Sequence, residues 1–179
     1  MATISGFKSQ MQGGGARPNQ FRVDLTFPAL AGPNAPFAGQ TGQFLCKSSI
    51  LPASTIEDIT AQYRGRPVHF AGERTFQPWQ VTIYNDTNFL IRNVMEQWSG
   101  RILAYSSTLG AQNPALYQAQ MSVHQLDRND RIVKTYTFYD AYPTAISQIQ
   151  LDYEQNNQIE TFDVEFTYNY FVASNVTSG

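Results

Sequence analysis

The segment RGRPVHFAGERTF, residues 64 to 76, brings together three arginines, one histidine and two phenylalanines around one proline and two glycines. Arginine beside aromatic rings suits nucleic acid, because bases stack on the rings while guanidinium groups bind phosphates. A loop punctuated by glycine and proline suits an active-site lid, and a charged strand pair suits docking onto another protein. The segment alone leaves these three kinds of function open.

The net charge weighs against nucleic-acid binding. The 179 residues carry a formal net charge of -2, whereas a dedicated nucleic-acid binder usually has a large positive excess that neutralises phosphates. The same length is enough for one sizeable hydrophobic core and short for two, so we expect a single domain.

Metal and thiol chemistry have little support. The two histidines, His69 and His124, fall on different predicted strands, and neither has a cysteine or carboxylate at ligand spacing. We expect each to be a strand residue with a satisfied hydrogen bond, and we expect no metal and no cofactor. Cys46, the single cysteine, lies in a strand-like stretch and is expected to be packed rather than nucleophilic.

Hydrolytic chemistry also lacks a recognisable constellation. The chain has no G-x-S-x-G turn, and the triple glycine at 13 to 15 is not followed by Gly-Lys-Ser/Thr, so it is a linker rather than a phosphate loop. Asp and Glu residues fall on several predicted strands of unknown spacing, so a carboxylate pair stays open, while a solvated strand face explains Asp163 and Glu165 more simply. We therefore expect a protein that is not an enzyme.

The elements that position segment 64–76 form a predicted hairpin. Residues 55 to 64 and 66 to 71 are strand-like around Gly65, so the segment is the return limb of that hairpin and the turn after it. Alternation of apolar and polar residues predicts further strands. They cover residues 21–27, 44–50, 79–84, 121–127, 131–140, 143–151 and 161–171.

Helical periodicity is convincing in one place only. A helix capped by Asp86 or Thr87 runs to about Ser99, with Gly100 placed to end it. The stretch 28–43 is rich in Pro and Gly and predicts a long surface loop, and residues 1–16 predict a flexible arm.

These elements predict a mainly β fold, a β-sandwich or partly closed β-barrel with one packed α-helix. Tyr136 and Phe138 alternate with Val133 and Tyr139, so this strand has apolar groups on both faces and is expected to be covered by a second layer or by an oligomer. No leader-like or membrane-spanning apolar run is evident, and we expect a soluble protein of a reducing compartment.

The order of several motifs resembles the tail tube proteins of contractile-tailed bacteriophages. The matching stretches occur in the family's order and cover most of the chain. They are RPNQFRV at 17–23, FLCKSSILPA at 44–53, GRPVHFAGERTFQPWQVTIYND at 65–86 and LDYEQNNQIETFDVEFTYNY at 151–170, with Tyr142-Pro143 between them.

The resemblance implies that inner-sheet strands of six copies merge into a continuous inner barrel, and that hexameric rings stack into a hollow tube. Such a tube is surrounded by a tail sheath protein, meets baseplate and tail terminator proteins, and conducts phage DNA into the host without binding it specifically. The virion tail would be assembled in the host cytoplasm. The chain then divides into an arm at 1–16, a tube domain at 17–171 and a tail at 172–179.

The resemblance also implies site residues. The hairpin at 55–76 would project and pair adjacent rings, since the arginine fork grips carboxylates at interfaces. Its contact residues would be Arg64, Arg66, His69, Phe70, Glu73 and Arg74, with a local Glu73–Arg74 surface pair as the simpler alternative for those two. A lumen for a polyanion should be polar and not strongly basic, so a face with Asp163 and Glu165, or with Gln148 and Gln150, is expected to line it.

Three regions depart from the family pattern, namely the loop at 28–43, the linker at 101–119 and the tail at 172–179. Two other functions stay open. One is the tube of a phage-derived contractile injection particle or secretion machine, related to the haemolysin-coregulated protein of type VI secretion. The other is a carbohydrate-binding β-sandwich that would use an exposed Trp79 or tyrosines as stacking platforms.

Overall fold

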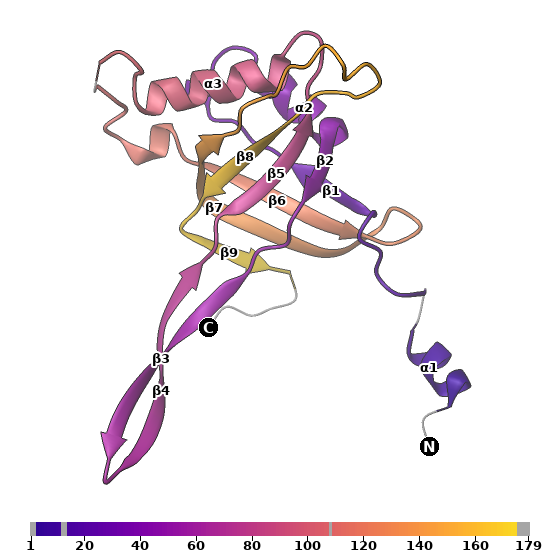
Figure 1. The fold of residues 1–179 in the computed structure, drawn as a ribbon, viewed down its shortest axis with the longest axis vertical. Coiled ribbons are helices and arrows are strands. Elements are labelled where there is room, and N and C mark those ends of the chain that lie inside the picture. Colours follow the sequence, from indigo (N-terminus) through magenta and orange to yellow (C-terminus); the bar gives the residue numbers. More distant parts are fainter. Residues whose placement is uncertain (1–2, 12–13, 108, 175–179) are drawn as a thin grey trace.

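The computed structural model describes residues 3–11, 14–107 and 109–174, and the chain is mainly β, as predicted (Figure 1). The elements are, in chain order, α1 (Ile4–Gln10), β1 (Phe21–Asp24), η2 (Ala29–Ala31), α2 (Ala35–Leu45), β2 (Cys46–Ser49), β3 (Ser54–Tyr63), β4 (Arg66–Phe76), β5 (Trp79–Tyr84), α3 (Leu90–Ile102), η3 (Pro114–Leu116), β6 (Ala119–Leu126), β7 (Ile132–Ile146), β8 (Thr161–Thr167) and β9 (Tyr170–Ala173). Among the described residues, none of these helices is both long and apolar enough to cross a membrane.

Seven strands form one antiparallel sheet in the order β1-β6-β7-β8-β5-β2, with β9 added on β7. The strand path does not close, so within one chain the sheet is open and has β1 and β2 at its two ends. The predicted partly closed barrel is therefore a folded open sheet. An end strand with one paired edge is a liability that a partner can remove by pairing with the other edge.

Strand β7 folds this sheet in two. Its first part pairs with β6 and β9, and its last part pairs with β8. Asp140 has a φ of 59°, and the register to β8 shifts between Pro143 and Ala145. Because proline has no N–H to donate, it is tolerated at such an irregularity. The two separate strands predicted at 131–140 and 143–151 are thus wrong, since one bent strand runs from Ile132 and ends at Ile146.

The strand predicted at 161–171 is instead two strands. Strand β8 ends at Thr167, and the Asn169 N–H donates to the carbonyl of Tyr139 (3.1 Å). Strand β9 then pairs along β7. Tyr168 stays in the core and its hydroxyl donates to the carbonyl of Gln77 (2.8 Å). Tyr170 is exposed and stacks on Tyr139, so it does not continue the buried face of β8.

The two halves of the sheet enclose an aromatic core. The rings of Trp79 from β5 and Phe138 from β7 stack with centroids 4.3 Å apart, and Phe166 from β8 lies against the same indole. All three side chains are fully buried. Large rings of this kind contribute most of the apolar burial in a small core.

Helix α3 closes this core at one end of the sheet (Figure 1). The predicted helix exists, and its predicted apolar face is buried: Ile91, Val94, Met95 and Trp98. The predicted cap at Asp86 or Thr87 is wrong in position, because the helix begins at Leu90 and Phe89, with a φ of 54°, is its N-cap residue. Asp86 still supports the first turn, since its carboxylate accepts from the N–H of Leu90 (2.9 Å). Gly100 does not end the helix as expected. It lies within it, where a Cβ would meet the Tyr105 ring at 2.8 Å.

Helix α2 overturns the predicted surface loop at 28–43. Ala35, Ala38 and Gly42 are its buried residues, and a Cβ on Gly42 would stand only 3.1 Å from Leu25 Cδ1. The small residues that indicated a loop therefore form the face that lets a helix approach β1 closely. Phe44 and Leu45, predicted as strand, end this helix, and β2 begins at Cys46.

The amino-terminal stretch is also more regular than the predicted arm. Thr3 caps helix α1, whose residues are all exposed, so nothing in the described chain packs over it. Gly14 and Gly15 have φ near +80°, a conformation that favours glycine. Gly13, part of the predicted glycine linker, lies outside the described residues, as do 175–179 of the predicted tail.

Candidate assembly surfaces

Strands β3 and β4 form a two-stranded hairpin that extends away from the seven-stranded sheet, toward one end of the long axis (Figure 1). We refer to Ser54–Phe76 as the hairpin and to residues 59–70 as its tip. Its strand pair was predicted, and the return limb runs on to Phe76. Arg64 and Gly65 have φ of 49° and 79°, the pair of positive values that a type I′ turn requires.

One face of the hairpin tip is apolar. Directly opposite residues share a face, and the register pairs Ile59 with Phe70 and Ala61 with Val68. Tyr63 continues this face toward the turn, opposite Arg66. Ile59, Tyr63, Val68 and Phe70 are all exposed. A two-stranded hairpin is only marginally stable alone in water, so an uncovered apolar face indicates a missing partner.

The opposite face of the tip is polar. His69 lies opposite Thr60, and its Nδ1 is 2.6 Å from Asp58 Oδ2. The Thr60 hydroxyl donates to the same carboxylate oxygen (3.1 Å). The prediction that His69 is a strand residue with a satisfied hydrogen bond is confirmed. His69 and Phe70, both predicted as contacts, therefore lie on opposite faces of the hairpin.

The remaining predicted contact residues divide between the two ends of the hairpin. Arg64 lies in the turn and Arg66 follows it, and the Arg64 guanidinium lies over the Tyr63 ring at 5.4 Å. Glu73 and Arg74 lie nearer the base, where Arg74 Nη1 donates to Ser54 Oγ (2.9 Å) rather than pairing locally with Glu73. The six residues are all exposed but do not form one cluster.

Sequence reasoning missed the apolar side chains Ile59, Tyr63 and Val68. The signal was present in the alternation Ile59-x-Ala61-x-Tyr63, which places three residues on one face of a strand.

The base of the hairpin is fixed to the core. The Trp79 Nε1–H donates to Ser49 Oγ and to the carbonyl of Ile50, both at 3.0 Å, just before β3 begins. Phe76, at the end of β4, packs edge-on against Phe171. The hairpin is therefore held at its root while its tip remains free.

Two of the predicted lumen residues share the outer face of the sheet. Glu165 lies opposite Gln80 and Asp163 opposite Thr82 in the β5–β8 pair. The Thr82 hydroxyl donates to Asp163 Oδ1 (2.6 Å), while Glu165 is exposed. This outer face carries the alternate residues of strands whose other residues fill the core. Its side chains are Gln80, Thr82, Tyr84, Thr161, Asp163, Glu165 and Thr167, with Lys47 over the Tyr84 ring at the β2 edge.

Gln148 and Gln150 do not belong to that strand face. They lie in the segment after β7, and both are exposed. We call residues 148–160 the acidic loop, because it contains Asp152, Glu154 and Glu160 and no lysine, arginine or histidine.

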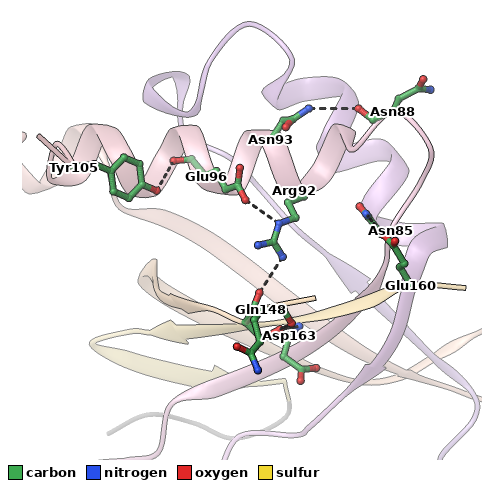
Figure 2. Close-up of polar contacts among 10 residues, drawn as sticks. Asn85, Asn88, Arg92, Asn93, Glu96, Tyr105, Gln148, Glu160 and Asp163 are labelled. Atoms are coloured by element: carbon green, nitrogen blue, oxygen red, sulfur yellow. Dashed lines mark hydrogen bonds and ion pairs between the residues drawn. The ribbon is translucent and has the colours of Figure 1, made fainter. Parts of the chain in front are cut away.

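The acidic loop is anchored at both ends (Figure 2). At its start, Arg92 of α3 donates to the carbonyl of Ser147 (2.9 Å) and pairs with Glu96 (2.8 Å). At its end, Asn85 Nδ2 donates to Glu160 Oε2 (2.9 Å). The Asp163 N–H also donates to Ser147 Oγ (2.8 Å), which closes the base of the loop.

The loop surrounds a concavity of about 540 Å³, a volume within the range of ordinary binding pockets. Its lining mixes apolar side chains with carboxylates, among them Leu151, Tyr153, Ile159, Asp152 and Glu160. The three apolar members are exposed, and Tyr153 is fully so. Like the hairpin tip, this is an apolar surface that no other described part of the chain covers.

His124 belongs to a buried polar cluster that sequence reasoning did not assemble. Its Nε2 lies 2.9 Å from Asp24 Oδ2 and its Nδ1 lies 2.8 Å from Thr135 Oγ1, while Arg22 Nε is 3.3 Å from Asp24 Oδ1. The expectation of a satisfied strand histidine is confirmed. The cluster ties the end strand β1 to β6 and β7.

The thiol and the indole singled out in the sequence are both structural. Burial raises the pKa of Cys46 to about 12, so little thiolate forms near neutral pH, in agreement with a packed rather than nucleophilic cysteine. Trp79 is 0% exposed, and the sugar-stacking platform expected of it is therefore wrong. Within the described residues, no three His, Cys, Asp or Glu side chains come together as metal ligands would.

Comparison with known sequences gives a consistent result. Residues 16–174 match the family model described as phage tail tube protein. The chain is 31% identical to tail tube protein gp19 of Enterobacteria phage T4 over 157 residues, which cover 87% of this chain and 90% of that protein. It is 30% identical to the tail tube protein of Serratia phage KSP90 over 172 residues, covering 94% and 95% of the two chains.

Comparison with solved structures shows the same fold at lower sequence identity. A chain in the baseplate of the anti-feeding prophage aligns with a TM-score of 0.62 at 17% identity, covering 88% of this chain and 94% of that one. A chain in the extended sheath–tube complex of the PVC extracellular contractile injection system aligns with a TM-score of 0.52 at 13% identity, covering 98% and 100%.

Proposed function

The chain belongs to the phage tail tube protein family, and from this we propose that it forms the inner tube of a contractile phage tail by stacking of hexameric rings. The tube is the conduit through which the genome passes into the host. The protein is accordingly a virion component that assembles in the host cytoplasm.

The observation that carries the proposal is the hairpin. It leaves the sheet, is fixed at its root by Trp79, and exposes an apolar face at its tip. A partner that covers this face would also stabilise a strand pair that is marginal on its own. Arg64, Arg66, His69, Phe70, Glu73 and Arg74 are the proposed inter-ring contacts, now joined by Ile59, Tyr63 and Val68.

The open sheet supports ring formation. Its end strands β1 and β2 have one paired edge each in the strand path. Six copies in a ring bring such edges together and complete one continuous inner barrel, which removes the edges that a free sheet exposes. The same assembly would cover the second apolar face of β7, which carries Val133 and Tyr139.

The outer face of β5 and β8 is the proposed lumen wall. Its charged side chains are Asp163 and Glu165, with Lys47 at the β2 edge, and the rest are polar or tyrosine. A wall without a cluster of cations lets a polyanion slide, because fixed lysines and arginines would bind phosphates and retain it. Gln148 and Gln150 remain lumen candidates only where the acidic loop turns toward the axis.

The chain has a structural rather than an enzymatic role. The tube domain expected at 17–171 extends through β9, because Val172 and Ala173 pair with Thr137 and Tyr136 of β7. The expected tail at 172–179 therefore begins later than predicted. The tail sheath, baseplate and tail terminator proteins are the expected partners. Phage DNA passes without specific binding. A phage tail is favoured over an injection particle by the identities near 30% to phage proteins, against 17% or less to the injection-particle chains.

Electron microscopy of the purified chain over a concentration series tests the proposal. Rings of six and hollow stacked tubes are the expected result with no other component added. A monodisperse monomer at every concentration, and also after addition of a baseplate template, would contradict it.

A further inference from the structure

The tube function assigns the hairpin to assembly but leaves its receiving surface undefined. Within residues 3–11, 14–107 and 109–174, the chain has a second exposed apolar surface, the acidic loop, whose Leu151, Tyr153 and Ile159 are all exposed around the concavity. We propose that the acidic loop of one copy receives the hairpin tip of a second copy in the adjacent ring. This inference rests on the proposed tube function and names the partner surface within it.

One surface projects, the other is concave, and both expose apolar side chains. The hairpin tip is a narrow two-stranded ribbon with the apolar face of Ile59, Tyr63 and Phe70. The loop offers a concavity of about 540 Å³ with apolar and acidic lining. Contact would remove both apolar surfaces from water, and burial of such surface is the main favourable contribution to protein association.

Their charges are opposite. The hairpin tip, residues 59–70, contains Arg64 and Arg66 and no carboxylate, and its His69 is held by Asp58. The acidic loop contains three carboxylates and no basic residue. Arginine binds carboxylates through two parallel hydrogen bonds, which fixes orientation as well as adding attraction. Opposite charges on two surfaces of one chain also disfavour pairing of each surface with itself.

The positions of the two surfaces require two copies stacked end to end. The hairpin extends to one end of the long axis, and the acidic loop, the orange segment between β7 and β8, lies at the other end beside α3 (Figure 1). The loop is anchored by Arg92 and Asn85, and the hairpin by Trp79. Two rooted surfaces at opposite ends form a heterologous contact, which repeats from ring to ring without closing on itself.

Disulfide trapping in the full-length chain tests this pairing. Tyr63→Cys and Tyr153→Cys, introduced together, place one thiol on the apolar face of the tip and one on the loop. The matched control combines Gln62→Cys with Tyr153→Cys, because Gln62 is the adjacent residue on the opposite face of β3. Native Cys46 should form few disulfides of its own, because its thiol is half-buried and burial raises its pKa, which keeps it protonated.

After mild oxidation of assembled protein, a non-reducing gel should show a ladder for the Tyr63/Tyr153 pair that continues well past the number of copies in one ring. The control pair should give at least 10-fold less cross-linked product (about 1.4 kcal/mol of contact preference). A ladder that stops at the size of one ring would place the contact between neighbours within the ring and overturn the proposal. Equal cross-linking in test and control would overturn it as well.

A charge exchange covers the case in which the cysteine variants do not assemble. Arg64→Glu with Arg66→Glu should abolish stacking, and adding Asp152→Arg with Glu154→Arg should restore tubes. The control adds Asp130→Arg, Asn129→Lys and Gln40→Lys instead, three exposed positions outside the loop and the proposed lumen wall. These changes return the same net charge and should not restore tubes. Absence of rescue by the loop changes refutes the pairing, whereas absence of any tubes from the wild-type chain refutes the tube function itself.

Discussion

Phe70→Ser should weaken tube assembly without unfolding the chain. Phe70 is 55% exposed, so more than half of its ring is free to be buried by a partner. A phenylalanine buries about 200 Å², and the exposed share is therefore about 110 Å². At about 25 cal/mol per Å² this corresponds to about 2.7 kcal/mol for each hairpin contact. In a stacking assembly, that loss raises the concentration needed for growth by roughly 100-fold.

Sedimentation of assembled tubes over a protein concentration series measures this critical concentration. Gln62→Ser, on the opposite face of the hairpin, is the matched control and should change it by less than about 5-fold, the size of a loss below 1 kcal/mol. Circular dichroism should give the same melting temperature for unassembled Phe70→Ser and wild type, because the ring is largely outside the core. A normal critical concentration for Phe70→Ser would refute the assignment of the apolar face to assembly.

Three other perturbations test separate parts of the structure. Gly42→Val should cost about 1–3 kcal/mol in urea unfolding of the unassembled chain, because the added side chain meets Leu25, and a loss below 0.5 kcal/mol, about the size of an ordinary surface substitution, would contradict close packing of α2. Backbone N–H groups of Arg131 and Asn129 lower the pKa of Asp127. The stability that this carboxylate contributes is therefore present above its unfolded pKa and is lost as the pH falls through its folded pKa. Asp127→Asn should flatten the curve of unfolding free energy against pH below about pH 4, and an unchanged curve would count against this role. Asp163→Lys with Glu165→Lys should slow genome ejection from particles by adding cations to the proposed lumen wall, whereas unchanged ejection kinetics would move the lumen to another face.

Alternation made most of the strands predictable, because one buried face imposes a period of two. Strand β5 and the buried face of β8 were predicted with their core residues, and helix α3 was predicted from spacings of three and four. Helix α2 was missed for a physical reason. Its contact with β1 is made by alanine and glycine, so its buried face has neither the bulk nor the polarity contrast that periodicity detects.

Strand β7 was predicted as two strands because a proline such as Pro143 usually ends a strand. Here a register shift beside it accommodates the missing N–H, and the sheet bends instead of ending. The candidate surfaces were predictable only in part. The hairpin and its arginines were recognisable from the sequence, but the apolar face depends on cross-strand register. The concavity of the acidic loop was not predictable, because it depends on two distant hydrogen bonds, from Arg92 to Ser147 and from Asn85 to Glu160.

The opposite placement of hairpin and acidic loop gives any stack of this chain a direction. In the proposed stack, the ring at one end has hairpins that no acidic loop receives, and the ring at the other end has acidic loops that no hairpin occupies. The two termini therefore differ chemically, and a protein that starts growth at one of them is the wrong shape and charge to stop it at the other. The proposed contact is the same from ring to ring, so it sets the direction of a stack and leaves the number of rings open.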